Sequence, residues 1–232
     1  DSAVALLEDS AQASGCNSFG LRMAEARQMA DFGPVSLLLS HQRTLRDALR
    51  TTAQYRHLLH ESLALFIEEV GKTVIVREEV VTDHPMAARQ ATELALGALF
   101  RLCSSLLGQH WHPLTVNFAY EAPDETQIYS RLFGCKLEFG SEFNGFVFSS
   151  VDLDTPNPLA DPVMARYAER FIQSLPGVSD HSLLLDVRKA IYLLLPMGRA
   201  TVEQVAQAQA VNLRTLQRRL DAEGVTFSQL IN

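Results

Sequence analysis

Three polar side chains near the end of the chain have the types and spacing of residues that bind nucleic-acid bases. Arg214, Gln217 and Arg218 lie within the segment VNLRTLQRRL, residues 211–220. In a helix, positions i, i+3 and i+4 share one face. Arginine pairs with guanine through two hydrogen bonds and glutamine pairs with adenine in the same way, so this face suits the major groove of DNA.

The other side of the same predicted helix is apolar. Leu213, Leu216 and Leu220 follow the spacing i, i+3 and i+7 of a buried stripe. Thr215 and Arg219 flank the polar face and are predicted to reach phosphates. The alternative is an ordinary amphipathic helix with a solvated basic face, which is common on protein surfaces.

The elements around this helix favour a helix-turn-helix. Thr201 is placed to cap a first helix, and the small side chain of Ala206 lets a second helix cross closely. A turn is expected at residues 209–211, after which Asn212 caps the second helix and Gly224 ends it. A capped helix, a short turn and a capped basic helix are together more specific than the arginine spacing alone.

Charge is distributed unevenly along the 232 residues. The formal net charge is −7, which excludes a protein whose whole surface coats nucleic acid. Residues 196–232 contain four arginines and three acidic residues, a net +1, so the other 195 residues carry −8. Any basic function therefore belongs to the C-terminal segment.

The preceding part of the chain predicts an α+β fold, with a mostly antiparallel sheet, helices packed on it, and an all-α helix-turn-helix segment after it. Residues 62–70 and 73–81 are rich in β-forming residues and read as a hairpin joined by Gly71 and Lys72. The other expected strands are 114–122, 135–140 and 143–150, and the expected helices are 3–13, 34–40, 44–57, 85–107, 124–133, 161–174 and 180–195, with two more in 201–232.

A change in composition at residue 152 indicates a domain boundary. The segment DLDTPNPLADP, residues 152–162, contains three prolines and three aspartates, as linkers often do. The sequence therefore predicts a regulatory, effector-binding domain in residues 1–155, a helical linker and dimerisation region in 156–195, and a helix-turn-helix in 196–232.

Polar residues among apolar strand neighbours are the candidates for binding a small molecule. His60 precedes the first strand, Arg77 lies in VIVREEV, and Asn117 lies between two apolar residues. Arginine binds carboxylates, and asparagine binds amides or hydroxyls. The competing interpretation of each is an ordinary solvated or structural residue, and Arg77 is expected on the solvated face of its strand. The net negative charge of this half instead favours a cationic ligand such as an amine or a basic amino acid, for which the candidates are Glu78, Glu121 and Glu142.

Two further groups of residues have types that could bind a metal or act as a nucleophile. His110 and His112 flank Trp111, but without further ligands at suitable spacing the better reading is a loop packed on the tryptophan, and no metal is expected. Cys103 and Cys135 lie in apolar runs, where a thiol is inert. No phosphate-binding loop or hydrolase motif occurs, so neither a cofactor nor an enzymatic activity is expected.

Cysteine usage and hydropathy predict a soluble cytoplasmic protein with no membrane partner. Three cysteines form an odd number without paired spacing, which is typical of a reducing compartment. No apolar run approaches the roughly 20 residues needed to span a bilayer. The chain begins with Asp1, so a preceding segment is expected in the natural protein.

Residues 201–227, with the segment RTLQRRL, resemble the first helix-turn-helix of the AraC/XylS family of bacterial transcription regulators. The segments FGPVSLLLSHQRTLRDAL, RQATELALGAL, FGCKLEFG and FNGFVF are similar to the effector-binding domain of one branch of that family, which includes regulators of ornithine and amine catabolism. The resemblance covers most of the chain.

The resemblance implies roles for particular residues. The family's base-contacting positions fall on Arg214, Gln217 and Arg218, and Asn212 stands where a capping serine is usual. Gln209 and Ala210 stand where the family commonly has an apolar residue and glycine. The family has a second helix-turn-helix, so the chain, which stops at Asn232, is expected to be part of a longer regulator.

The resemblance also implies the partners: operator DNA, a small-molecule effector, RNA polymerase and a second copy of the chain. The alternative from another class is a small-molecule-binding or catalytic α+β domain whose C-terminal helices mediate protein association.

Overall fold

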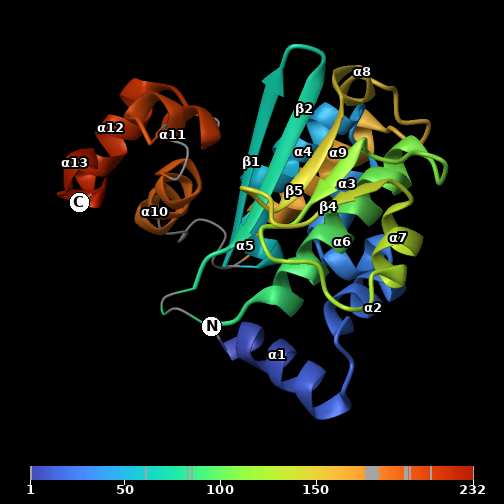
Figure 1. Ribbon diagram of the computed structural model, residues 1–232. Helices are drawn as coiled ribbons and strands as arrows, with labels where there is room; N and C mark the ends of the chain where they lie inside the picture. Colours follow the sequence, from blue (N-terminus) through green and yellow to red (C-terminus); the bar gives the residue numbers. More distant parts are fainter. Residues whose placement is uncertain are drawn as a thin grey trace.

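The protein has a mixed α/β body followed by a group of helices, in agreement with the predicted fold class (Figure 1). The computed structural model describes residues 2–60, 62–82, 84, 86–175, 183–195, 198, 200–209 and 211–231. Three positions used in the predictions lie outside these ranges: Pro85, the start of the helix expected at residue 180, and Ala210 in the turn.

A five-stranded sheet forms the centre of the body. Its strands are β1 (Leu63–Val70), β2 (Thr73–Val80), β3 (Thr115–Asn117), β4 (Lys136–Glu138) and β5 (Gly145–Ser149), in the spatial order β1-β2-β5-β3-β4. Only the β3–β4 pair is parallel among these strands, so the prediction of a mostly antiparallel sheet is confirmed. The predicted hairpin is also confirmed, and Gly71 in its turn adopts a φ of 62°.

Strand β3 is much shorter than the predicted strand 114–122. After Asn117 the backbone leaves the regular ladder, because the Ala119 N–H donates to the side chain of Asn144 at 2.8 Å. The prediction of a long strand was therefore wrong, although the segment lies in the sheet as expected.

Helices cover the inner face of this sheet. Before the sheet come α1 (Ser2–Ser14), α2 (Phe19–Ala26), η1 (Met29–Phe32), α3 (Val35–Ser40), α4 (Leu45–Gln54) and α5 (Arg56–Leu59), and later come α6 (Arg89–Leu107), α7 (Gln127–Phe133), α8 (Ser150–Leu153) and α9 (Pro162–Gln173). The helix predicted at 44–57 begins after its expected cap, Thr44, whose hydroxyl accepts from the Asp47 N–H at 3.2 Å. It is interrupted at Tyr55, so it forms two helices.

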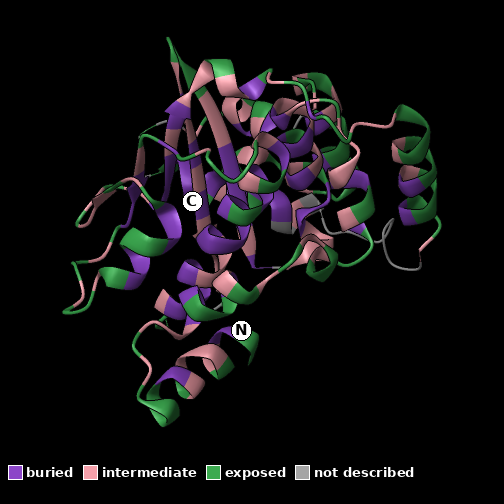
Figure 2. Ribbon diagram, turned by 90° about the vertical axis from the view of Figure 1, so that its right-hand side faces the viewer, coloured by how far each residue is buried: buried purple, intermediate pink, exposed green. Residues whose placement is uncertain are grey.

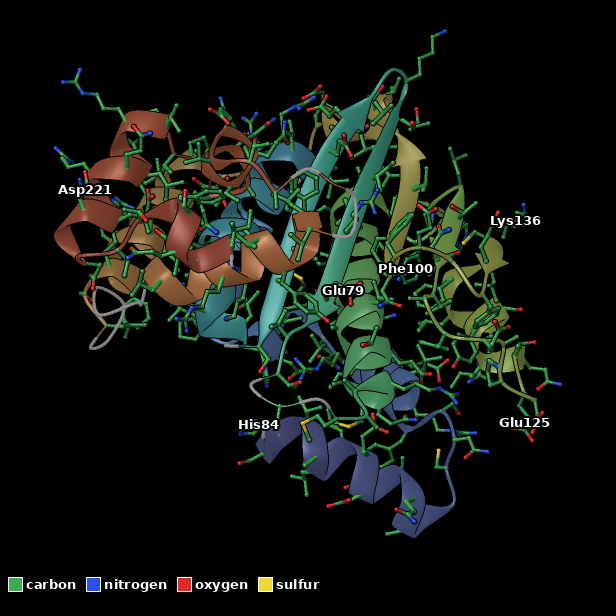
Figure 3. The ribbon with its side chains drawn as sticks, turned by 60° about the vertical axis from the view of Figure 1, so that its left-hand side comes forward. Glu79, His84, Phe100, Glu125, Lys136 and Asp221 are labelled. Atoms are coloured by element: carbon green, nitrogen blue, oxygen red, sulfur yellow. The ribbon has the colours of Figure 1, made fainter. Side chains whose placement is uncertain are left out.

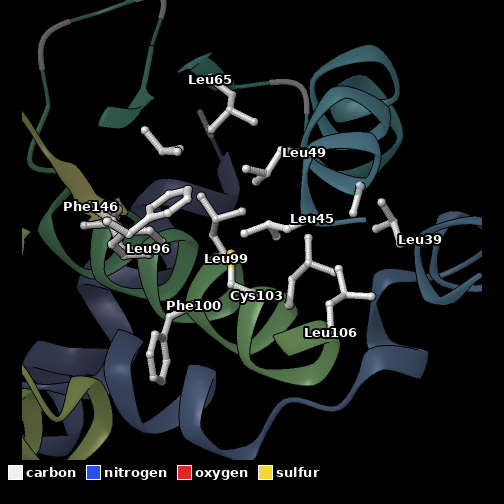
Figure 4. Close-up of a cluster of buried hydrophobic side chains, with 14 of the residues drawn as sticks. Leu39, Leu45, Leu49, Leu65, Leu96, Leu99, Phe100, Cys103, Leu106 and Phe146 are labelled. Atoms are coloured by element: carbon white, nitrogen blue, oxygen red, sulfur yellow. The ribbon is translucent and has the colours of Figure 1, made fainter. Parts of the chain in front are cut away.

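The long helix α6 is buried on several sides. Leu96, Leu99, Leu102 and Cys103 pack with residues of the sheet and of α4, as Figure 4 shows for part of this cluster. Phe100 instead packs against Trp111 and Phe133, at ring-centroid distances of 6.0 and 5.3 Å. In Figure 2 the buried residues follow the strands and the inward sides of the helices. The predicted position of this helix, against the sheet and under other helices, is confirmed.

The C-terminal helices form a second apolar cluster on the other face of the hairpin. They are α10 (Leu183–Leu194), α11 (Val202–Ala208), α12 (Leu213–Ala222) and the short α13 (Phe227–Ile231), and they lie beside β1 (Figure 1). Their buried side chains pack with Ala64 and Phe66 of β1. By contrast, Ala168 and Ile172 of α9 belong to the main core. The domain boundaries at 155 and 195 remain predictions, although the division of apolar packing lies between α9 and α10.

Candidate functional sites

Helix α12 begins and ends as its sequence predicts. The Asn212 side chain accepts a hydrogen bond from the Thr215 N–H at 2.8 Å, and Gly224, with a φ of 71°, follows the last turn. Thr201 caps α11 in the same way, accepting from the Gln204 N–H at 3.3 Å. Val211 N–H donates to the Ala206 carbonyl at 3.0 Å across the turn between the two helices. The described residues therefore form the expected helix-turn-helix.

The two faces of α12 differ as expected. Leu216 and Leu220 are buried in the second cluster at 0% and 2% exposure, whereas Arg214, Gln217 and Arg218 are exposed. Arg219 is also exposed and Thr215 is half-buried. One detail of the prediction was wrong. Leu213, the first residue of the helix, is only half-buried and is not part of the second cluster.

The exposed side of α12 carries uncompensated positive charge. In the part of the chain that the structure describes, Arg214, Arg218 and Arg219 form no ion pair within the chain. Asp221, which lies at the outer edge of the molecule in Figure 3, marks the C-terminal end of this side. The arginines are therefore presented to solvent and are not held against the sheet-containing body.

A cavity of about 220 Å³ lies on the inner face of the sheet. Its walls come from α1, the α2–η1 region, α4 and α5, the start of β1, the end of β2, and α6. Most of the lining is aliphatic, and two of its residues, Leu65 and Leu99, are labelled in Figure 4. Such an apolar cavity with a few polar groups is typical of a small-molecule site.

Glu78 is a buried acidic group of this cavity. It is 6% exposed and lies on the inner face of β2 with Val76 and Val80. Burial, and then the charge of Glu79, raise the pKa of its carboxyl from 4.5 to about 8. The other two acidic candidates, Glu121 and Glu142, are exposed and do not line the cavity.

The three polar residues that the sequence singled out are not brought together. His60 lines the cavity, and its Nδ1 accepts from the Ser62 N–H at 3.2 Å. Arg77 projects from the opposite face of β2 and stacks on the Phe143 ring at 4.5 Å. Asn117 accepts from the Thr115 hydroxyl at 2.9 Å and does not line the cavity. The geometry thus places only His60 at a candidate ligand site.

Arg56 connects the cavity with the C-terminal helices. It lines the cavity from the first turn of α5 and is 7% exposed. Its guanidinium forms an ion pair with Asp186 of α10 and donates to Oε1 of Gln209, at the end of α11, at 3.2 Å. Gln209 Nε2 in turn donates to the Asp186 carbonyl at 2.9 Å. One buried polar cluster therefore touches the cavity, α10 and the helix-turn-helix.

Strand β1 makes a second connection through its alternating side chains. Leu63 and Leu65 line the cavity on one face. Ala64 and Phe66 pack with the C-terminal helices on the other. Successive residues of a strand point to opposite faces. A shift of β1 therefore moves side chains in the cavity wall and side chains that pack with the C-terminal helices.

Residues 1–157 match the family model described as the arabinose-binding domain of AraC transcription regulators, N-terminal. The chain belongs to this family. A relative, the HTH-type transcriptional regulator VirS of Mycobacterium tuberculosis, is 29% identical over 230 residues, which cover 98% of this chain and 68% of VirS. The ornithine utilization regulator of Pseudomonas aeruginosa is 26% identical over 219 residues, covering 93% of this chain and 64% of that protein.

The crystal structure of the transcriptional regulator CdpR from Pseudomonas aeruginosa has a similar fold. Its TM-score is 0.55 at 19% identity, over 91% of this chain and 69% of that one. The family and the relatives are transcription regulators and not enzymes, so this protein is an AraC-type regulator with a ligand-binding N-terminal domain. The alternative of a catalytic domain is set aside.

Trp111 and the two cysteines in apolar runs lie in packed surroundings in this AraC-type regulator. Trp111 donates to Asp152 Oδ2 at 2.9 Å and packs against Phe100 and Phe148, which confirms the packed loop. Burial raises the pKa of the Cys103 thiol, and it raises that of Cys135 to about 11, so neither forms a thiolate near pH 7. Among the described residues, no helix is long and apolar enough to cross a bilayer.

Sequence reasoning missed Arg56 and the buried partners of Gln209. From the sequence, Gln209 is only a departure from the apolar residue that is usual in the family. Arg56 and Gln209 are 153 positions apart, so no local pattern links them. The sequence signal is the glutamine at a position that is commonly apolar. A polar side chain that is buried there needs a hydrogen-bond partner.

Proposed function

We propose that this protein binds operator DNA through α12 and that a small metabolite in the cavity controls this binding. The observation that carries the proposal is the orientation of α12. Its basic side faces solvent, while its apolar side packs in the second cluster with α10 and α11, which contact the strand that also lines the cavity. A regulator of this kind acts in the cytoplasm, where bacterial DNA is accessible.

In the proposed complex, Arg214, Gln217 and Arg218 contact base edges in the major groove. Thr215 and Arg219 reach the phosphates beside them. Asn212 fixes the start of the helix, where backbone N–H groups also favour a phosphate. Support comes from the exposure of these guanidinium groups and from the family to which the chain belongs.

The cavity is the proposed effector site, with His60 at its wall. The proposed effector is an amine or an amino acid, and one relative is named for ornithine utilisation. Arg77 and Asn117 do not line this cavity. A role for them in ligand binding therefore remains a prediction from the sequence alone.

The effector signal is proposed to reach the helix-turn-helix through Arg56 and β1. A ligand beside Arg56 strengthens or weakens the ion pair of Arg56 with Asp186 and its hydrogen bond with Gln209. Such a ligand shifts the population of arrangements of α10 and α11 only if it binds one arrangement more tightly than another.

The test is DNA binding by the regulator expressed from its whole gene. We expect operator affinity to fall steeply with salt, because bound phosphates release counterions. Arg218→Ala should weaken binding to the preferred site by about 1–3 kcal/mol. Arg22→Ala removes an exposed arginine on α2 and should leave the affinity within about twofold. Equal binding by wild type and Arg218→Ala across the salt range would contradict the proposal.

Homodimerisation and contact with RNA polymerase remain predictions of the resemblance. A homodimer would present two recognition helices to a repeated DNA site. Light scattering of the regulator across a range of concentrations measures its mass, and a monomer at all concentrations would exclude a stable dimer.

A further inference from the structure

Glu78 places a buried carboxyl at the wall of the cavity, and its Oε2 has no partner among the residues that the structure describes. Its position on β2 is opposite Leu65 of β1. The Oε2 atom is buried and accepts no hydrogen bond from any residue that the structure describes. Buried polar groups in proteins are normally paired, so an unpaired carboxyl beside a cavity indicates a missing ligand group.

The charged groups around the cavity do not neutralise Glu78. From α5, Arg56 is engaged by Asp186 and Gln209. On the α2–η1 side Arg27 is half-buried and Asp31 is exposed, and Asp31 accepts from the Gln28 N–H at 2.8 Å.

The other titratable neighbours of Glu78 in the described part of the chain supply no counter-ion either. His60 at the end of α5 is partly exposed and accepts from the Ser62 N–H. From α6, Cys103 is a buried thiol, whose pKa is raised by burial and further by the charge of Glu78. Glu79 adds a like charge from the other face of β2, where it accepts from Asn144.

We propose that Glu78 is the counter-ion for a protonated amine of the effector, whose hydrocarbon part fills the rest of the cavity. This proposal rests on the proposed function, because it names the ligand class of the same effector site. An ammonium group supplies both the charge and the hydrogen-bond donors that the carboxylate lacks.

Other ligand classes fit this cavity less well. A carboxylate ligand would meet the Glu78 carboxyl in an apolar environment, where Arg56 is already engaged by Asp186 and Gln209. A sugar would place several hydroxyl groups against aliphatic walls, and each unpaired hydroxyl would cost free energy. The aliphatic walls include Leu59, Leu63 and Leu99. An alkyl chain with one ammonium group matches both parts of the site.

Amine binding at this site is coupled to proton release. In the empty cavity Glu78 is mostly protonated near pH 7, because its pKa is about 8. The amine binds the ionised carboxyl, so the carboxyl proton leaves to solvent while the ammonium group keeps its own protons. Affinity should therefore rise about tenfold from pH 6 to 7 and about fivefold from pH 7 to 8.

Titration calorimetry of the 232-residue chain tests the proposal with three probes of similar shape: n-hexylamine, n-hexanol and hexanoate. We expect hexylamine to bind most tightly at pH 8, with the pH dependence given above. Repeating the titration at pH 7 in buffers of different ionisation enthalpy should show release of close to one proton per amine bound.

Three variants make the result specific. Glu78→Gln keeps the size of the side chain and should weaken hexylamine binding at pH 8 at least about 30-fold, while removing the pH dependence and sparing hexanol. Glu142→Gln removes an exposed carboxylate away from the cavity and should bind like wild type. Ala95→Leu fills the cavity and should weaken the binding of amine and alcohol alike.

Two outcomes would overturn the proposal. In the first, hexanol binds as tightly as hexylamine and Glu78→Gln does not change the affinity for hexylamine. In the second, hexylamine does not bind at millimolar concentration. Either result leaves the DNA-binding proposal intact, because operator affinity is measured without these probes. Conversely, hexylamine binding that depends on Glu78 in a protein without DNA binding would support the ligand site and reject the regulator mechanism.

Discussion

At the scale of single residues, Glu78 departs from the pattern of its strand. Val74, Val76 and Val80 share its inward face, so the same position would favour an apolar residue if packing alone mattered. A carboxyl group in this place costs stability when it is ionised. The protein therefore keeps a destabilising group at the wall of its cavity, as ligand-binding sites often do.

The stability of the protein should depend on the protonation of Glu78. The folded-state pKa of about 8 is higher than the value of 4.5 expected when unfolded, so the folded protein holds the proton more tightly. This contribution is fully present below about pH 4.5 and is lost as pH rises through about 8. Glu78→Gln should therefore be more stable than wild type by roughly 3–5 kcal/mol at pH 9 and nearly equal to it at pH 5.

Urea unfolding at pH 5, 7 and 9 measures this difference, with Glu142→Gln as the exposed control that should follow wild type. Parallel stability profiles for wild type and Glu78→Gln would show that the Glu78 carboxyl is not buried as described.

Residue spacing predicted α12 and its two faces well. The caps at Thr201 and Asn212, the buried Leu216 and Leu220 and the exposed basic face all depend on local geometry that the sequence contains. The cavity could not be predicted in this way. Its lining comes from elements between α1 and α6, and only their packing brings Glu78 and His60 to one space.

At the scale of elements, the junction between α5, α10 and α11 is the proposed route from the cavity to the helix-turn-helix. Arg56 and Asp186 are both buried, and their side chains are each 8% exposed. Breaking such a pair leaves an uncompensated buried charge and destabilises the fold. Gln209 is the better point for a test, because its replacement leaves that ion pair in place.

Gln209→Leu should uncouple the two sites. It restores an apolar residue and removes the hydrogen bonds of Gln209 with Arg56 and with the Asp186 carbonyl. We expect the affinity for the cavity ligand and the affinity for DNA without ligand to stay within about threefold of wild type. The change in DNA affinity caused by the ligand should shrink by about 0.5–2 kcal/mol.

DNA titrations with and without hexylamine measure this coupling. Gln207→Leu, at an exposed position on the same helix, is the matched control and should keep the wild-type response. An unchanged ligand effect in Gln209→Leu would exclude this junction as the route of the signal.

Several elements differ from the sequence-based predictions for physical reasons. The helix expected at 44–57 breaks at Tyr55, which leaves Arg56 at the start of a new helix and directed to α10. Helix α2 was not predicted, since its first turn contains Gly20, a poor helix former. Tertiary packing explains that glycine, because a Cβ there would lie 2.0 Å from the Gln90 carbonyl oxygen.

At the scale of the whole molecule, the hairpin separates two apolar clusters with different roles. The main core fixes the cavity, and the second cluster holds the helix-turn-helix against the outer face of β1. The sequence predicted both parts and their order, since composition and periodicity change along the chain. It did not predict that they share β1, because that contact depends on how the C-terminal helices fold back over the sheet.

The most direct test of the central claim is selection of binding sites from a random DNA library by the regulator expressed from its whole gene. The account predicts an enriched sequence motif for wild type. It predicts weaker enrichment and relaxed preference at individual base pairs for Arg214→Ala and Arg218→Ala, because these side chains are assigned to bases. A library that stays random with wild type, or the same motif at the same strength with both variants, would contradict the claim that α12 reads DNA.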